Sequence, residues 1–344
     1  MRIFSYRNKL LLRRILVILA VVAAVILVFC VVRFIYLQRY LVFSSGTVYF
    51  DYDQELTYEN LEQPQLDVSD FPIEMVDPEE SVSVGGSDQE LKTLSGYYIT
   101  TAMMQDMTAV NQALEEVESL SALLLDMKSI YGNFYFASPL AGANTASADL
   151  SAIATLIETL DREGRTYLIA RVPAFSDSNF ALANQSCGLP LSSGALWMDS
   201  NGCYWLNPAD SDVQDYLVSI AQALSELGFD EVVFDGFYFP DSQNIVFEGD
   251  KQAAVAAAAQ AIREKLEGTP IRVSFGSSDA NVAASAERVY LASESGAEVA
   301  GIVEQLSSSL ENPAAQVVFC TASRDTRYEG YGILRPLLES DSES

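Results

Sequence analysis

The sequence predicts an α/β protein of 344 residues: a (β/α)8 barrel of the TIM type, preceded by one N-terminal transmembrane helix and an acidic linker. Three observations support this prediction. From residue 95 onward, short apolar runs alternate with helical stretches, which is typical of a parallel sheet. The roughly 244 residues from 95 to 338 match the ~250 of such barrels. A long apolar run and an acidic stretch precede them.

The N-terminal segment has the character of a membrane anchor. Residues 15–32 are apolar without interruption, and 34–37 extend the run past Arg33 towards the roughly 20 residues that span a bilayer. A cleaved signal peptide would have a shorter apolar region ending in small residues. Because five basic residues precede the span and two follow it, we expect a cytoplasmic N-terminus at 1–14, a single-pass anchor in the lipid bilayer at 15–37 and an extracytoplasmic body.

Charge divides the rest of the chain. Residues 46–94 hold thirteen acidic residues and one lysine, interrupted by prolines, so 38–94 is expected to be a solvated stalk. Residues 339–344 form an acidic tail after the barrel domain at 95–338. Beyond residue 45 the net charge is -34, which disfavours nucleic acid and anionic lipid as partners and fits neutral or cationic ones.

The predicted barrel strands are apolar runs rich in β-branched and aromatic residues: 96–100, 122–128, 166–173, 231–237, 271–277, 288–294, 316–322 and, more weakly, 331–336. Helices are expected between them near 105–119, 147–163, 211–227, 249–267, 279–287 and 296–310. An open doubly wound sheet is the alternative. The sequence after the first strand, however, lacks the Gly-rich fingerprint of dinucleotide-binding sheets.

Histidine is absent, which excludes Ser-His-Asp and Cys-His nucleophile systems and His-ligated zinc. Acid–base chemistry must then come from carboxyl, amino, phenol or thiol groups with shifted pKa values. No cofactor or metal is expected. Cys187 and Cys203 either form a disulfide that closes a loop of about 15 residues, contributing on the order of 3 kcal/mol, or remain free thiols.

Polar side chains gather at the C-terminal ends of the predicted strands, where the active sites of barrels are built. Asp126 and Lys128 share one face of the second strand by alternation, and Asp235 shares a face with Val233 on the fourth. Asp235 is then either a structural residue paired with a nearby cation or a nucleophile or base at the barrel mouth.

The segment 174–209, between the third strand and its helix, is too long for an ordinary connection. It contains Trp197, Tyr204 and Trp205, including both tryptophans of the chain. Aromatic rings of this kind either stack against sugar rings or pack the loop back onto the barrel.

Five segments in order resemble a bacterial glycoside hydrolase family with a TIM-barrel domain and a GFDExxFDYxRFP signature. They are DMK, YLIARVPAFSD, WMDSNGCYWLNP, LGFDEVVFDGFYFPD and FG, and they cover about residues 96–276. The fourth strand also looks like that of alpha-amylase-type barrels, whose aspartate is the nucleophile. The resemblance implies a polysaccharide or cell-wall glycan as substrate and Asp235 as a catalytic residue. The substrate-binding candidates are Lys128, Arg171, Asp177, Trp197, Tyr204, Trp205, Tyr238 and Asp241.

The sequence departs from the family at informative positions. Tyr238 stands where the signature has arginine, Gly236 where it has tyrosine, and the fifth strand lacks the glutamate of amylase-type barrels. The second carboxyl group is therefore Asp126, Glu294 or Asp279. The alternative to a hydrolase is a catalytically degenerate barrel that binds envelope glycan or scaffolds envelope proteins.

Overall fold

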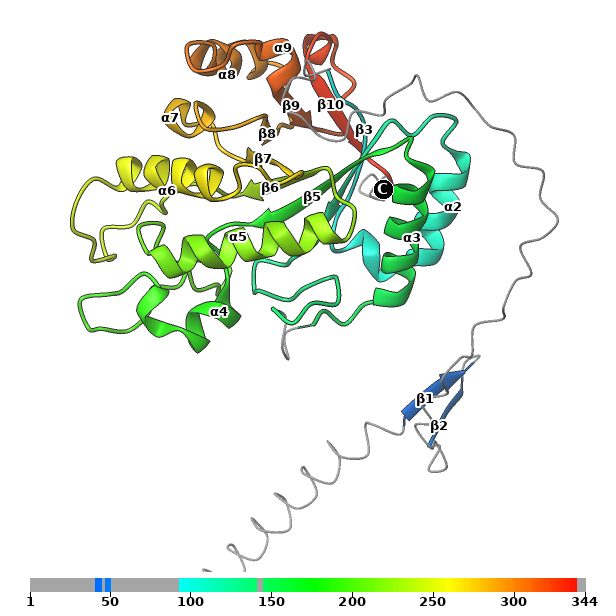
Figure 1. Ribbon diagram of the computed structural model, residues 1–344, viewed down its shortest axis with the longest axis horizontal. Helices are drawn as coiled ribbons and strands as arrows, with labels where there is room; N and C mark the ends of the chain where they lie inside the picture. Colours follow the sequence, from blue (N-terminus) through cyan, green and yellow to red (C-terminus); the bar gives the residue numbers. More distant parts are fainter. Residues whose placement is uncertain (1–40, 45–46, 51–92, 141–144, 339–344) are drawn as a thin grey trace, which may run out of the picture. The chain divides into compact units, whose positions relative to one another are not determined.

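The computed structural model describes residues 41–44, 47–50, 93–140 and 145–338 (Figure 1). Contacts divide the chain into two compact units, Met1–Ser81 and Val82–Ser344, and each is described by itself. The expected cytoplasmic segment, the anchor at 15–37, most of the stalk and the acidic tail lie outside the described residues. Within the part of the chain that is described, no helix is both long and apolar enough to span a bilayer.

The described part of the first unit is a strand pair. β1 (Leu41–Ser44) and β2 (Thr47–Phe50) run antiparallel, with Leu41 opposite Phe50 and Ser44 opposite Thr47. These two strands lie within the stalk expected at 38–94, where no strand was predicted. The stretch carries alternating β-branched and aromatic residues around Ser45-Gly46, which is a hairpin pattern.

The second unit is a closed barrel of eight parallel strands, and its eighth strand pairs with its first. All eight predicted strands are confirmed within a few residues, including the weakly predicted last one. In chain order they are β3 (Ser95–Ile99), β4 (Ala122–Asp126), β5 (Tyr167–Pro173), β6 (Glu231–Asp235), β7 (Arg272–Phe275), β8 (Val289–Ala292), β9 (Val317–Cys320) and β10 (Gly332–Pro336).

Helices connect the strands on the outside of the ring (Figure 1). The predicted ones are present but shorter: α2 (Met107–Glu116), α3 (Leu150–Glu163), α5 (Ser211–Glu226), α6 (Lys251–Lys265), α7 (Ala280–Ala283) and α8 (Val299–Leu306). The unpredicted ones are η2 (Met103–Gln105), α4 (Ser178–Ala183), η3 (Gln185–Cys187), α9 (Pro313–Gln316) and η4 (Thr326–Tyr328). Helix ends follow local chemistry. For example, the Asp149 carboxylate accepts from the Ala152 amide at the start of α3, and Gly164 ends that helix with φ 62°.

Alternation along the strands divides the core into two layers. One side of each strand faces the helices, as Val232 and Phe234 of β6 do. The other side fills the barrel, where Leu124, Ile169 and Val233 pack with interior residues of the later strands. Burying each such aliphatic side chain stabilises the fold by roughly 1.5–3 kcal/mol. Because Val233 lies inside the barrel, Asp235 two residues further on is at its C-terminal mouth.

A buried polar network closes the opposite end of the barrel. Glu231, fully buried at the start of β6, accepts hydrogen bonds from Arg288 Nη1 (2.6 Å), Ser274 Oγ (2.5 Å) and the Tyr167 hydroxyl (2.9 Å). A buried carboxylate is tolerable only with such partners. This end of the barrel is therefore closed by a buried network in which the carboxylate already has its partners.

The cysteines do not form the disulfide that was one of the two expectations. Cys187 and Cys203 are both buried free thiols with different surroundings. The Cys203 thiol donates to the Ile130 carbonyl at 2.7 Å, whereas the Cys187 thiol lies beside Asp210 and Asp212. A bond between them would require these side chains to leave their present contacts.

Candidate active site

Two of the predicted residues meet directly at the barrel mouth. Asp126 ends β4 and stands opposite Arg171 of β5 in the strand register. The Arg171 Nε donates to Asp126 Oδ1 at 2.5 Å, and both side chains are mostly buried. The guanidinium also lies 5.8 Å from the centre of the Tyr98 ring. Arg171 is thus fixed from two sides, and its charge is matched by Asp126.

Asp235 lies close to this pair. In the register, Arg171 stands opposite Val233 and Pro173 opposite Asp235, so the carboxylate is one layer nearer the opening. Burial raises its pKa; the positive charge of Arg171 and the Gly236 amide lower it, and the negative charge of Asp126 raises it. The salt-bridge partner of Arg171 is Asp126. Asp235 is therefore a partly buried carboxylate that lies near the Arg171 charge without forming a salt bridge with it. That is the environment of a tuned acid–base or nucleophilic group.

A glycine makes room for this carboxylate. A Cβ on Gly276 would lie 2.3 Å from Asp235 Oδ1, closer than any side-chain atom can stand. The Gly276 carbonyl also accepts from the Phe237 amide at 3.1 Å, which holds the start of the following loop against β7. Gly276, the glycine of the FG motif at the end of the fifth strand, is therefore needed to leave space for the Asp235 carboxylate.

Three aromatic rings extend from the mouth, and we call Trp197, Trp205 and Tyr238 the aromatic wall. The centres of Trp197 and Trp205 are 6.2 Å apart, and those of Trp205 and Tyr238 are 5.2 Å apart. Tyr238 is 52% exposed, whereas Trp205 is buried. The Trp205 Nε1 donates to Asp199 Oδ2 at 2.9 Å, which fixes the indole. Of the two roles expected for the 174–209 loop, packing onto the protein holds for Trp205. Tyr238, which comes from the segment after β6, is the exposed ring that can stack a ligand.

Lys128 lies beyond the end of its strand, where it meets Asp177. β4 ends at Asp126, so Lys128 leaves the strand face and pairs with Asp177 Oδ2 at 2.7 Å, with both side chains fully buried. The Tyr216 hydroxyl donates to the same oxygen at 2.8 Å, and the Phe180 amide donates to Oδ1. The expectation that Lys128 shares a face with Asp126 is wrong, because strand alternation ends with the strand. This pair anchors the loop over α4 and α5.

The other predicted residues are spread around the mouth. Glu294 and Asp241 are exposed, in the loops after β8 and β6. Asp279 caps α7 by accepting from the Asn281 amide at 2.8 Å. Tyr204 is half-buried next to Trp205 in an extended segment, in which neighbouring side chains point to opposite sides.

Cys320 is a buried thiol at the end of β9 inside the barrel. Its pKa is raised to about 12, first by burial, while Arg171 lowers it and Asp235 and Asp126 raise it. These influences show that Cys320 lies near all three charged groups. A thiol with this pKa stays protonated at neutral pH, so it acts as a small apolar residue there.

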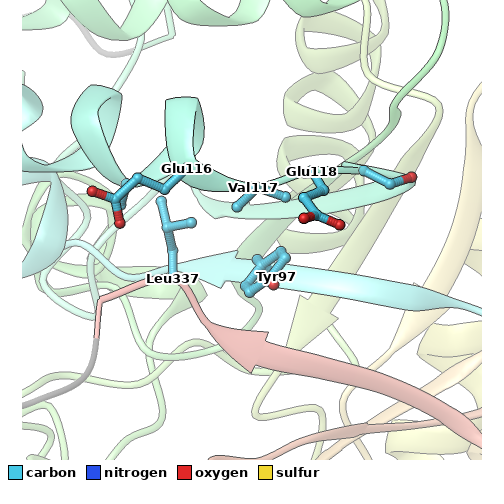
Figure 2. A pocket seen from close by; sticks show the side chains of 7 residues that line it. Tyr97, Glu116, Val117, Glu118 and Leu337 are labelled. Atoms are coloured by element: carbon cyan, nitrogen blue, oxygen red, sulfur yellow. The ribbon is translucent and has the colours of Figure 1, made fainter.

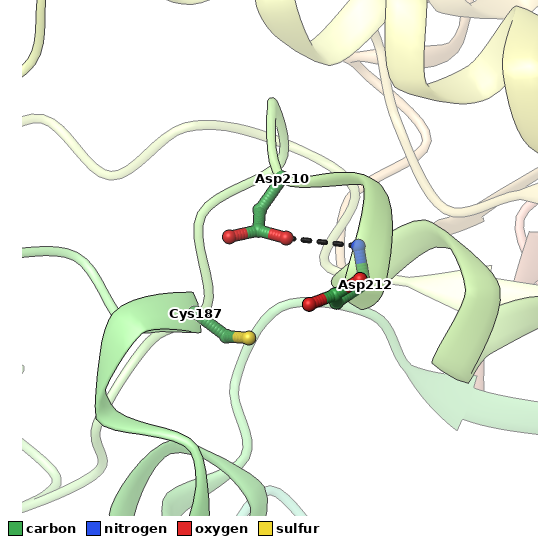
Figure 3. Close-up of side chains that lie close together, drawn as sticks. All are labelled: Cys187, Asp210 and Asp212. Carbon is green, nitrogen blue, oxygen red and sulfur yellow. Dashed lines mark hydrogen bonds between the residues drawn. The ribbon is translucent and has the colours of Figure 1, made fainter.

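A second cluster lies at the start of α5 (Figure 3). Donor atoms of Cys187, Asp210 and Asp212 are all within 4.8 Å of one another. One Asp210 oxygen already accepts from the Asp212 amide at 2.8 Å as the helix cap. Carboxylates at a helix N-terminus are stabilised by the helix dipole, which accounts for their presence without a ligand.

A hollow of about 530 Å³ lies on the outer side of the barrel (Figure 2). Tyr97 of β3, the end of α2 and Leu337 after β10 line it, together with Glu116 and Glu118. Tyr97 alternates with the inward-facing Tyr98, so this hollow is separated from the mouth by the strand itself.

Sequence reasoning missed the residues that support the site. Asp199 fixes the Trp205 indole. Gly276 leaves room for the Asp235 carboxylate. The Tyr98 ring packs against the Arg171 guanidinium. Asp199 and Gly276 stand inside the quoted motifs WMDSNG and FG, so the motifs held the signal. Tyr98 could have been found only from the register of β3 against β4.

Taken together, the fold and site define a class: a (β/α)8 barrel with carboxylates and an aromatic wall at the C-terminal mouth. Residues 96–311 match the family described as "Putative glycosyl hydrolase domain", and the chain belongs to this family. The resemblance seen in the sequence is thereby confirmed.

Several solved structures are similar to this chain. An alpha-galactosidase from Lactobacillus brevis is 10% identical, with a TM-score of 0.52 over 74% of this chain and 38% of its own. A hypothetical protein from Ruminiclostridium thermocellum is 22% identical, with a TM-score of 0.45 over 52% of this chain and 96% of its own. An alpha-galactosidase from Geobacillus stearothermophilus is 11% identical, with a TM-score of 0.48 over 72% and 40%. The chain thus spans about two fifths of the two galactosidases. No curated protein matches the sequence.

Proposed function

We propose that this glycoside hydrolase-like barrel cleaves a cell-surface or environmental polysaccharide, with Asp235 as the nucleophile or base. The observation that carries the proposal is the setting of Asp235: a mostly enclosed carboxylate at the mouth, held against Gly276, with a pKa raised by burial. The aromatic wall beside it supports a sugar ligand, because sugar rings stack on aromatic faces.

A hydrolase of this kind needs a second carboxyl group. Asp126 is close enough for its charge to raise the pKa of Asp235, but its Oδ1 accepts from Arg171. It therefore suits a role in stabilising charge better than that of proton donor. Glu294, exposed after β8, is the candidate for the acid in our proposal. A separation of ~5–5.5 Å between the working carboxyl groups gives retention and ~6.5–9.5 Å gives inversion.

The alternative is a barrel that binds envelope glycan without cleaving it. One observation favours this alternative: Asp126, the carboxylate whose charge acts on Asp235, is engaged by Arg171. In addition, Tyr238 offers a stacking surface where the family signature has a guanidinium. In such a barrel, Tyr238 would still bind a sugar ring, whereas Asp126 would not be available as a second catalytic carboxyl group.

The test is hydrolysis of a panel of cell-wall and plant glycans by the full chain and by Asp235→Asn. If Asp235 carries the reaction, the rate should fall by roughly 10³-fold or more. Asp215→Asn, which removes an exposed carboxylate on α5, is the matched control and should keep full activity. Undiminished hydrolysis by Asp235→Asn would reject Asp235, and glycan binding without hydrolysis in the wild type would establish the alternative.

We further propose that residues 15–37 anchor the chain in a membrane with the barrel outside the cytoplasm. The support is the uninterrupted apolar run and the excess of basic residues before it. The full chain should sediment with membranes and resist carbonate extraction, and removal of residues 1–37 should release it. Protease added to spheroplasts should digest the barrel domain if the orientation is as proposed.

A further inference from the structure

The aromatic wall presents an electron-rich surface to a ligand. The faces of tryptophan and tyrosine rings carry negative electrostatic potential and attract cations within about 6 Å of the ring centre. Tyr238 is the open end of the wall, with half of its surface exposed, and its ring is 5.2 Å from that of Trp205. A ligand that stacks on Tyr238 therefore gains from an apolar ring face and also from a positive charge.

Two carboxylates strengthen this preference. Burial raises the pKa of Tyr238, and the negative charges of Asp235 and Asp199 raise it further, so both lie within electrostatic reach of the phenol. Asp199 is fixed in place because it accepts from the Trp205 indole and from the amides of Asn201 and Cys203, each at 2.9 Å. The charges of two carboxylates thus act on the wall.

The cations of these loops already have contacts. Lys251 Nζ donates to the Ser242 carbonyl at 3.0 Å and lies 5.0 Å from the centre of the Phe239 ring. Arg171 donates to Asp126, and Lys128 is fully buried in its pair with Asp177. Neither Arg171 nor Lys128 forms a salt bridge with Asp199 or Asp235. A ligand at the wall therefore meets these two carboxylates. The field of the whole chain has the same sign, with a formal net charge of -27.

From these contacts we propose that the sugar unit bound at the aromatic wall carries a free, positively charged amino group. The glycan is then an amine-bearing polysaccharide, and its ammonium group lies between Tyr238 and the carboxylates. This inference rests on the proposed function, since it assigns a substrate class to the same site. Uronic or sulfated glycans are disfavoured, because their anions would approach Asp235 and Asp199.

The chain carries its own probe for this proposal. Its only two tryptophans, Trp197 and Trp205, both belong to the wall, so intrinsic tryptophan fluorescence reports directly on binding there. The full chain would be titrated with glucosamine and galactosamine oligomers and with the N-acetylated form of each. The members of each pair share backbone, length and linkage, and the nitrogen is a charged ammonium in one and a neutral acetamide in the other.

The amine form of at least one pair should bind roughly tenfold more tightly than its acetylated counterpart, equal to ~1.4 kcal/mol. Raising the salt from about 20 to about 300 mM should reduce this preference, since screening weakens charge attraction. Asp235→Asn should also reduce it with little effect on the acetylated form, and Tyr238→Leu should weaken both. Glu115→Gln, an exposed carboxylate on α2, is the charge-matched control and should change neither.

Equal or tighter binding of the acetylated oligomers, or no fluorescence response to any oligomer, would overturn the inference. So would an amine preference that survives both high salt and Asp235→Asn. The proposed hydrolysis is separable: amine-selective binding without cleavage supports the inference and rejects the hydrolase. Cleavage of a neutral glycan that depends on Asp235, with no preference for amine-bearing oligomers, supports the hydrolase and rejects the inference.

Discussion

At the scale of single residues, the contact between Asp235 and Gly276 decides whether the carboxylate can occupy the mouth. Gly276→Ala places a Cβ where Asp235 Oδ1 now lies, so the carboxylate must move. A displacement of about 1 Å at a catalytic group can cost roughly 10²-fold in rate. We therefore expect a loss of that order in kcat/KM on a cleaved glycan.

Gly301→Ala is the control for this prediction. Gly301 lies in α8, where an added Cβ meets nothing within 4 Å. Activity should stay at the wild-type level, and stability should stay the same or rise slightly, because alanine favours a helix over glycine. Full activity in Gly276→Ala would show that Asp235 does not need its present position.

The charge of Arg171 influences the pKa of Asp235. This positive charge lowers a pKa that burial raises, so Arg171→Gln should raise the pKa of Asp235 further. If the ionised carboxylate is the working form, activity grows as pH rises through this pKa. The acidic limb of the kcat/KM profile should therefore move to higher pH in Arg171→Gln. A limb that stays in place, or moves to lower pH, would show that another group controls it.

At the scale of elements, the pair Lys128–Asp177 ties the loop after β4 to α4. Both side chains are fully buried, so Lys128→Met leaves Asp177 as an unpaired buried charge. Breaking such a pair typically costs ~3–5 kcal/mol. The free energy of unfolding, measured by denaturant titration, should fall by about that much.

The exposed pair Lys265–Asp215 is the matched control. Lys265→Met removes the same kind of side chain from a 2.7 Å pair that links α6 to α5 at the surface. Exposed pairs contribute about 0–1 kcal/mol, so this variant should unfold nearly as the wild type does. Equal losses in the two variants would contradict the structural role given to Lys128.

The elements that sequence predicted well are those with strong, local patterns. The barrel strands are short apolar runs between helices, and their inward faces could be counted by alternation from Val233 to Asp235. The mouth position of Asp235 follows from that counting once Val233 is known to face inward. Its geometry relative to Arg171 does not follow, because that geometry depends on the register of neighbouring strands.

The failures arose where a pattern stopped or where partners were distant in sequence. Alternation was carried past the end of β4 and misplaced Lys128, since its partner Asp177 is 49 residues away. Cys187 and Cys203 looked suitable for a disulfide by spacing, yet their thiols face different neighbours. β1 and β2 were hidden because their apolar residues follow directly on the predicted anchor.

At the scale of the whole molecule, the ring depends on the pairing of β10 with β3. Deleting residues 332–344 removes β10 and leaves β3 and β9 as unpaired edges with buried apolar residues exposed. Such edges template aggregation. The truncated chain should lose cooperative thermal unfolding and aggregate, as seen by circular dichroism and light scattering.

Deleting only 339–344 is the control, because these residues lie outside the described ring. The midpoint of thermal unfolding should then remain that of the full chain. A soluble, cooperatively unfolding protein without β10 would show that the remaining seven strands close by themselves.

The seam between β10 and β3 also bears on the order in which the barrel can assemble. Ile333 pairs with Ser95, and these residues lie at the two ends of the barrel sequence, so the ring cannot close before the whole barrel sequence has been synthesised. Until then the early strands must persist as an open, partly paired sheet, because loop closure over such a distance is slow. A cell that makes this protein has to keep that intermediate from associating with other copies while the last strand is still being made.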